Sequence, residues 1–354
     1  MQFALIDAII KANTARPAVS RQLRLPDIRA GFLFLPPQYK MPYSKPYLPL
    51  SDQLSLLKQR GLQVADDAAA VDCLRRNGYY RLSAYWYPFR EISAGRRTDR
   101  FLKNSHFENA VKLYSFDKKF KLLLLDALER VEIAVRAEIA LLLGGRDPFA
   151  YTNPSLLHPR FVSRQPPNNI SKHDEWLDKF DKQVRRSKDE FVLHHNRQYG
   201  PNSPLPIWIA IELWDFGTLS HFYGGLQVKD REAVATRFSV PDWRLMESWL
   251  MALNYVRNVI AHHGRLWNSN LSLNPRLPRR GEMPDFDALL PLYNASARVY
   301  SICCILSHLS KVTNASSPWP NELKTFVEGF PPMPYASAQD MGFPSGWQTH
   351  GFWR

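Results

Sequence analysis

Residues 107–143 read FENAVKLYSFDKKFKLLLLDALERVEIAVRAEIALLL, and this stretch decides the fold class. Its apolar residues recur every three or four positions, which is the repeat of an α-helix with one buried face. The residues that we expect in this face are Leu124, Leu128, Val131, Val135 and Leu142. Six charged side chains fall within residues 122–143, so the helix is not a span through a lipid bilayer. We therefore expect one long helix at the centre of a folded domain.

Helical signals continue on both sides of this stretch. Ser51 is expected to cap a helix that Gly61 ends, and the Asp66–Asp67 pair opens a second helix that Gly78 ends. Further helical patterns cover residues 174–198, 206–223, 230–238, 241–263 and 289–309. Alternating strand patterns are nearly absent. The sequence therefore predicts an all-α bundle.

The chain divides into three parts by composition. Residues 1–40 show little periodicity and precede a second methionine, Met41, so they are either a loosely packed extension or a wrongly assigned start. Residues 41–312 carry the helical patterns and form the expected domain. Residues 313–354 are rich in proline, glycine and aromatic side chains, and we expect this tail to pack irregularly on the domain.

The charge balance favours a polyanionic partner. Lysine and arginine number 46 against 33 aspartates and glutamates, a net charge of +13, which suits RNA. Cys73, Cys303 and Cys304 show no zinc-site spacing and are expected to be reduced in a cytoplasmic protein. No phosphate-loop glycine motif occurs, and the His194–His195 pair lacks a third ligand at sensible spacing. We expect no metal, no cofactor and no membrane partner.

Residues 255–268, YVRNVIAHHGRLWN, carry the candidate chemistry. Arg257, Asn258, His262 and His263 interrupt an apolar helix face near its end, where Gly264 is expected to cap the helix. Asn258 and His262 are four residues apart and share a face. Arg257 lies about 140° around the axis from His262, but a long arginine side chain can reach back towards the imidazole.

These residue types suit the cleavage of RNA without a metal ion. A base must take the proton from the ribose 2′-OH, an acid must protonate the leaving 5′-oxygen, and a cation must stabilise the phosphate between them. Histidine suits the proton transfers and arginine the charge stabilisation. One Arg/His pair in each chain supplies few of the groups that this reaction needs. We therefore expect a homodimer, in which two pairs meet.

Several blocks of the sequence resemble the Abi-like (AbiD/AbiF-type) abortive-infection proteins. The 257–268 block is one of them, and it also matches the R-x4-6-H motif of the wider HEPN superfamily. The other blocks are Ser44-Lys45-Pro46, Arg60-Gly61-Leu62, Gly78-Tyr79-Tyr80-Arg81-Leu82-Ser83, Leu113-Tyr114-Ser115-Phe116-Asp117, Glu129-Arg130-Val131-Glu132 with Arg136, Phe216-Gly217-Thr218-Leu219-Ser220, and Met341-Gly342-Phe343-Pro344.

The resemblance implies a helical HEPN domain, usually dimeric, whose Arg and His motifs face one another in a cleft. It implies RNA cleavage that leaves a 2′,3′-cyclic phosphate and stops the growth of a phage-infected bacterium. An antitoxin or a phage-derived trigger would be further partners of such a protein. His262 is the first choice for the acid and base because it shares the Asn258 face, and His263 is the second. Asn258 would orient the histidine or the phosphate.

Further basic residues are expected to contact RNA, namely Arg136, Arg265, Arg276, Arg279 and Arg280. For Arg136 an ordinary ion pair with Glu132, four residues before it, is the favoured alternative. The aromatic segment 79–87 fits either a helix or a strand. It could stack on unpaired bases, but packing in a core is favoured.

Two functions of other classes stay open. His262 could merely cap the helix end and Arg257 could be a structural ion-pair partner. The chain would then be a non-catalytic module that binds RNA or a protein in a defence complex. A nucleotide-binding HEPN domain without cleavage is the other alternative.

Overall fold

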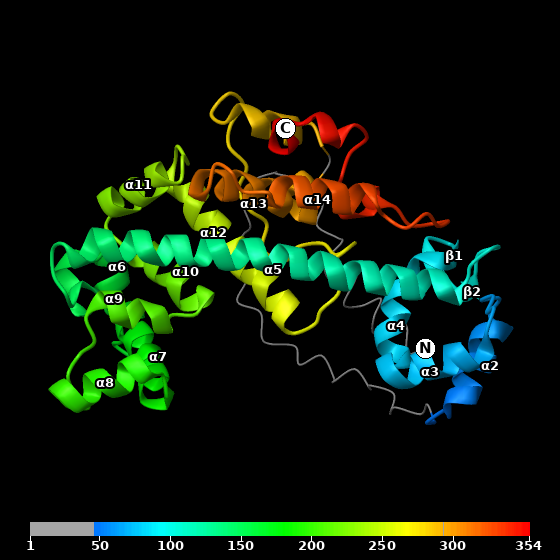
Figure 1. Cartoon of the computed structure of the whole chain (residues 1–354), viewed down its shortest axis with the longest axis horizontal. Helices are drawn as coiled ribbons and strands as arrows, with labels where there is room; N and C mark the ends of the chain where they lie inside the picture. Colours follow the sequence, from blue (N-terminus) through cyan, green and yellow to red (C-terminus); the bar gives the residue numbers. More distant parts are fainter. Residues whose placement is uncertain (1–45, 293) are drawn as a thin grey trace, which may run out of the picture.

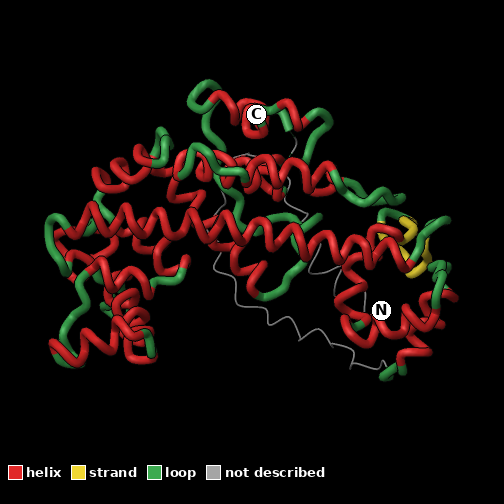
Figure 2. The backbone as a smooth tube through the Cα atoms, in the orientation of Figure 1, coloured by secondary structure: helices red, strands yellow, loops and turns green. Residues whose placement is uncertain are grey.

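The computed structural model describes residues 46–292 and 294–354. The expectations for residues 1–40, for Met41 as a start and for Ser44 and Lys45 lie outside the described residues. Within them the chain is predominantly helical, and its one sheet has two short strands (Figure 2). The all-α fold class is thus confirmed. No helix of the described residues combines the length and the apolar character needed to cross a membrane.

The long helix α5, Phe107–Gly144, runs along the length of the molecule (Figure 1). Its 38 residues correspond to about 57 Å at 1.5 Å per residue. Leu124, Leu128, Val131 and Val135 are fully buried, as the periodicity predicts, but Leu142 is only half-buried. Leu143 takes its place, because each step of four residues turns 40° past a full revolution and carries the buried stripe around the helix.

Near the beginning of α5 lie α2 (Leu50–Gln59), α3 (Asp67–Asn77) and α4 (Tyr79–Trp86), as Figure 1 shows. Asp66 caps α3, whereas Ser51 lies within the first turn of α2 and caps nothing. The ambiguous aromatic segment is the helix α4. Tyr85 and Trp86 are in the core, which confirms the packing interpretation for them, while Tyr80 is 69% exposed.

A hairpin that the pattern did not indicate joins these helices to α5. It consists of β1 (Arg90–Ser93) and β2 (Arg96–Phe101), and its turn residues Ala94 and Gly95 both have positive φ. Neither strand alternates apolar and polar residues, so the period-two signal of a strand is missing. Arg97 holds the hairpin to the body by donating to the carbonyl oxygens of Pro88 and Arg90.

Around the other end of α5 lie α6 (Pro159–Val162), α7 (Lys172–Arg186), α8 (Glu190–Tyr199), α9 (Ile207–Ala210), α10 (Phe216–Gly225) and α11 (Val228–Arg237) (Figure 1). Two expected helices are each divided. The pattern at 174–198 breaks at Ser187, whose backbone is extended, and the pattern at 206–223 breaks at Trp214 and Asp215. At the first break the Ser187 hydroxyl accepts the backbone N–H of Asp189, and at the second Asp215 caps the next helix by accepting the N–H of Thr218.

Helices α12 (Trp243–Ala261), α13 (Val299–Thr313) and α14 (Trp319–Glu328) pack against α5. The pattern at 289–309 becomes helical only from Val299. The tail contains α14 where only irregular structure was expected, and Trp319 donates its indole N–H to the carbonyl of Leu123 on α5. Further tail aromatics, Phe343, Trp347, Phe352 and Trp353, are buried. Cys73, Cys303 and Cys304 are free and buried.

Candidate functional site

The candidate motif lies at the carboxyl end of α12. His262 is the C-cap, with φ −88° and ψ 13°, and it follows the last helical residue, Ala261. The N–H of His263 donates to the carbonyl of Ile260 and the N–H of Gly264 to that of Val259, at 2.9 and 2.8 Å. This is a Schellman ending, in which two otherwise unpaired helix carbonyls are satisfied.

The left-handed position of this ending is occupied by His263, not by Gly264. His263 has φ +57°, a region in which glycine is usual. Gly264 is needed one residue later for a different reason. A Cβ on it would lie 3.0 Å from Cγ1 and 3.1 Å from the carbonyl oxygen of Val259. Gly264 thus takes part in the helix ending, as expected, through its N–H, whereas the strained left-handed backbone falls on a histidine of the motif.

A buried carboxylate on α5 holds the loop that follows the two histidines of the motif. Asp117 is 0% exposed and accepts hydrogen bonds from the backbone N–H groups of Leu266 and Trp267, the latter at 2.8 Å. The same carboxylate accepts the hydroxyl of Tyr85 at 2.7 Å and lies 3.2 Å from the ammonium of Lys121. Four partners therefore satisfy one buried charge, which fixes the loop against α5 and α4.

Two basic side chains bind the backbone of the same turn, and a third, from the turn itself, binds the backbone of α4. Arg81 donates to the carbonyl of His263 and Lys121 to that of Gly264, both at 2.8 Å. Arg265 donates to the carbonyl of Ala84, and burial lowers its pKa from the ordinary arginine value. Arg265 is thus half-buried against α4, an arrangement that favours a structural role over contact with RNA.

Arg257 faces two carboxylates from other helices. Its positive charge acts to lower the pKa of both Glu132 on α5 and Asp215 at the start of α10. Burial nevertheless raises the pKa of Glu132 above its ordinary value, against the opposing effects of Arg136 and Arg257. Among residues 46–292 and 294–354, no side chain makes a direct hydrogen bond or ion pair with Arg257. Arg257 is half-buried. The two carboxylates orient its guanidinium by charge, but they do not accept hydrogen bonds from it.

Asp215 is in this position because the helix expected at 206–223 breaks there. The carboxylate caps α10 by accepting the N–H of Thr218 at 2.6 Å and lies 3.5 Å from the ammonium of Lys179. Burial acts to raise the pKa of Asp215, but the Thr218 hydrogen bonds, Lys179 and Arg257 outweigh it and lower that pKa. Asn254 lies beside Gly217 of the same helix start, and its buried side-chain oxygen lacks a hydrogen-bond partner within the described residues.

The Glu132–Arg136 ion pair that the four-residue spacing predicts is present. Arg136 also donates to the backbone carbonyls of Trp214 and Glu212, so it fastens the break before Asp215 to α5. Its side chain is 16% exposed. These contacts leave little of the Arg136 guanidinium for a phosphate.

The structure brings some of the expected site residues together and separates others. Asn258 is half-buried, and His262 and His263 are exposed beside it. Arg276, Arg279 and Arg280 are exposed too, but their loop returns to the middle of α12. The carbonyl of Arg276 accepts the indole N–H of Trp249, 13 residues before His262, which is about 20 Å along the helix. Arg276 therefore lies away from the motif of its own chain, and Arg279 and Arg280 follow it in the same loop.

No group of three or more His, Cys, Asp or Glu side chains in the described part of the chain could hold a metal ion. Of the neighbouring histidines on α8, His194 is exposed and His195 is buried.

Sequence reasoning missed Asp117, Lys121, Asp215 and Asn254 as parts of the site. A signal existed for Asp215, because aspartate is one of the favoured residues at the N-cap of a helix. Asn254 is four residues before Asn258 and so shares its side of α12. No local pattern assigns Asp117 to the site, because its backbone partners, Leu266 and Trp267, lie 149 and 150 residues away.

We predict that Asp117→Ala lowers the free energy of unfolding by about 3–5 kcal/mol. The change leaves Lys121 and two backbone N–H groups buried without their common acceptor. Chemical denaturation followed by circular dichroism measures the effect. Asp126→Ala is the matched control, since Asp126 pairs with Arg130 on the same helix but is 46% exposed. The control is expected to lose less than about 1 kcal/mol; equal losses would contradict the anchoring role of Asp117.

We predict that His263→Gly raises the free energy of unfolding by about 0.5–1 kcal/mol. Glycine removes the left-handed strain, and this gain exceeds the entropic cost of ordering a glycine in the folded state. His262→Gly is the control, since His262 has a negative φ and offers no such relief. Thermal unfolding of both variants tests the assignment. A gain at residue 262 instead of 263 would show that the helix ends one residue earlier.

Comparison with known proteins agrees with the resemblance of the motif blocks. The family described as Abi-like protein matches residues 72–268, more than half of the chain, from within α3 to the end of the motif. The match includes Asp117, Glu132, Asp215 and Arg257. No curated protein and no solved structure matches the chain. The chain belongs to the Abi-like family and thereby, at a coarse level, to the proteins of abortive-infection defence.

Proposed function

We propose that this protein is a metal-independent RNA endonuclease of the HEPN type that acts as a toxin in abortive infection. Arg257 binds the phosphate at which the RNA is cut, His262 transfers the protons, and Asn258 orients one of them. The products are a 2′,3′-cyclic phosphate and a 5′-hydroxyl end. Its partners are RNA, a second copy of the chain, and an antitoxin or a phage-derived trigger.

The state of Arg257 is the observation that carries the proposal. The guanidinium groups of Arg136 and Arg265 donate hydrogen bonds to backbone carbonyls. Arg257 has no direct partner among the described residues, although it faces Glu132 and Asp215. Two carboxylates at longer range orient the guanidinium without occupying its N–H groups, so these can form bidentate hydrogen bonds to a phosphate.

The exposed histidines next to Arg257 supply the proton transfers. In the reaction a base removes the proton of the 2′-OH, the 2′-oxygen forms a bond to phosphorus, and the bond to the 5′-oxygen breaks as an acid protonates it. Imidazole suits both steps because it exchanges protons near neutral pH. Arginine stabilises the charge that develops on the phosphate oxygens.

The backbone favours His262 over His263 for this role. His262 continues α12 with a negative φ and lies four residues after Asn258, on the same side of the helix. His263 has left-handed backbone, which turns the chain away from the helix axis. Its carbonyl is fixed by Arg81, so His263 is better placed to shape the turn.

A homodimer completes the chemistry. One chain offers a single Arg257 and the two neighbouring histidines, whereas the reaction needs a base and an acid on opposite sides of the phosphorus. The motif lies at an exposed helix end, where a second copy can approach it. Two copies would place one histidine on each side of the bound phosphate.

We predict that the purified protein cuts total cellular RNA in the presence of EDTA and that His262→Ala slows this cleavage at least about 100-fold. Arg257→Lys is expected to slow it as well, because lysine keeps the charge but loses the bidentate geometry. The rate is measured on a labelled RNA, and the new ends are tested for a cyclic phosphate. Induced expression in a bacterium reports toxicity in parallel.

His194→Ala is the matched control, since His194 is an exposed histidine on α8. It should cleave like the unchanged protein. Loss of activity in His263→Ala but not in His262→Ala would reverse the assignment of the histidine. Reversible loss of cleavage in EDTA would overturn the metal-free mechanism. Unchanged toxicity of His262→Ala would favour a non-catalytic binding module.

A further inference from the structure

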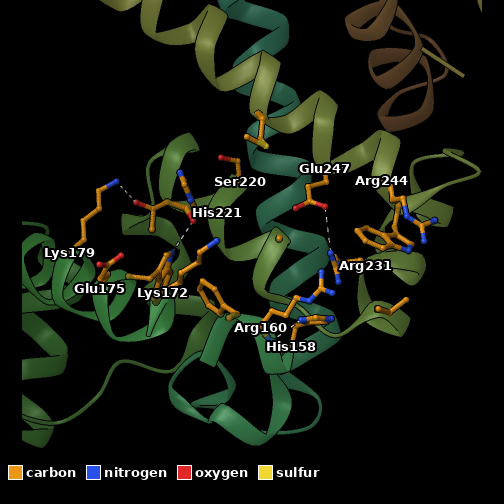
Figure 3. Close-up of a pocket in the computed structure, with 17 residues that line it drawn as sticks. His158, Arg160, Lys172, Glu175, Lys179, Ser220, His221, Arg231, Arg244 and Glu247 are labelled. Carbon is orange, nitrogen blue, oxygen red and sulfur yellow. Dashed lines mark hydrogen bonds and ion pairs between the residues drawn. The ribbon is translucent and has the colours of Figure 1, made fainter. Parts of the chain in front are cut away.

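A large basic pocket opens beside the amino-terminal half of α12, away from the motif. Its volume is about 970 Å³, and its walls come from α6, α7, α10, α11 and α12 (Figure 3). Five permanent cations line it and only two carboxylates, which gives a net charge of +3. The cations are Arg160, Lys172, Lys179, Arg231 and Arg244, and the carboxylates are Glu175 and Glu247.

The pocket contains a buried cation, Arg231, and is therefore more than a charged surface. Its side chain is 6% exposed and stacks on the ring of Trp243, with 3.7 Å from the guanidinium carbon to the ring centroid. Its one carboxylate contact, to Glu247, is long at 3.5 Å, and its Nε has no hydrogen-bond partner among the described residues. A buried cation this poorly satisfied favours an anion in the pocket.

Two further cations point into the same space. In Figure 3, Lys172 from α7 and Arg160 from α6 extend towards the pocket, and the Arg231–Glu247 pair lies on the same side of the view as Arg160. No side-chain partner holds either Lys172 or Arg160 within the described residues. The local field is positive: burial and then Arg231 and Arg160 lower the pKa of His158.

Part of the remaining wall is apolar, which an inorganic anion would not need. Phe161, Val228 and Met251 line the pocket, and Val228 and Met251 are 39% and 44% exposed. Gly225 allows this arrangement, because a Cβ on it would meet the ring of Phe161 at 2.4 Å. The volume is typical of sites for organic ligands, and guanidinium groups match phosphate oxygens in geometry. The pocket thus suits an organic phosphate.

The pocket and Arg257 share α12 and are linked by a common neighbour, Asp215. Met251 lines the pocket and precedes Arg257 by six residues, which is about 9 Å along α12. Lys179 also lines the pocket, and its ammonium contacts Asp215, the carboxylate that faces Arg257. One nucleic-acid strand is therefore able to reach both places.

We infer that this pocket binds a nucleoside phosphate, with the phosphate held by Arg160, Lys172 and Arg231 and the organic body against the apolar wall. The nucleotide comes either from an RNA strand that extends from Arg257 or from the free pool. Only the first source rests on the proposed cleavage of RNA.

Binding is tested in full-length His262→Ala, so that no RNA is cut and the result is independent of catalysis. The probes are a fluorescent pentauridylate and AMP, followed by fluorescence anisotropy and calorimetry. Arg160→Ala with Lys172→Ala is expected to weaken binding at least about tenfold. Arg164→Ala with Lys182→Ala is the matched control, because it removes two cations close by that do not line the pocket.

A second variant is expected to change affinity in the opposite direction. Glu247→Gln keeps the side-chain shape, removes the carboxylate from Arg231, and should tighten binding about fivefold. Loss of pentauridylate binding alone assigns the pocket to the RNA strand, and loss of AMP binding as well assigns it to free nucleotides. Equal affinities of the pocket and control variants for both probes would overturn the inference.

Discussion

The buried carboxylate of Asp117 is the interaction on which the arrangement of the motif depends. A charge that is 0% exposed is tolerated only with a full set of partners. Asp117 has two of them in the backbone just after the two histidines of the motif. Because Tyr85 and Lys121 supply the others, the loop, α4 and α5 have one relative position in which all four contacts form. The end of α12 is thereby set without contacts from the histidine side chains.

The other side of the motif is organised by charges and not by saturated hydrogen bonds. Arg136 fixes the break before α10 to α5, and this break presents Asp215 to Arg257. Glu132 completes the surroundings from α5. The rigid contacts thus belong to the neighbours, whereas Arg257 and the exposed histidines keep polar groups available. This separation between supporting and available groups is what a binding or catalytic site requires.

The sequence predicted those features that depend on local periodicity. The central helix, the helix of the motif and the Glu132–Arg136 pair all follow from spacings of three to five residues along one element. The hairpin, the left-handed His263 and the basic pocket do not. The hairpin lacks alternation, His263 occupies a position usual for glycine, and the pocket gathers residues from five helices. Only tertiary packing brings Arg160, Lys172 and Arg231 together, so no window of sequence contains their relation.

The length of α5 between Asp117 and Glu132 has a consequence for how this chain can vary. Fifteen residues separate the two, and both must face α12 or its loop. Inserting a single residue between them would rotate one relative to the other by about 100° and shift it by about 1.5 Å. Surface loops such as residues 163–170 absorb such changes in their own conformation. Within α5 every residue is part of the helical repeat. The segment can therefore accept substitutions, but the insertion or deletion of a residue would change the position of Asp117 relative to Glu132.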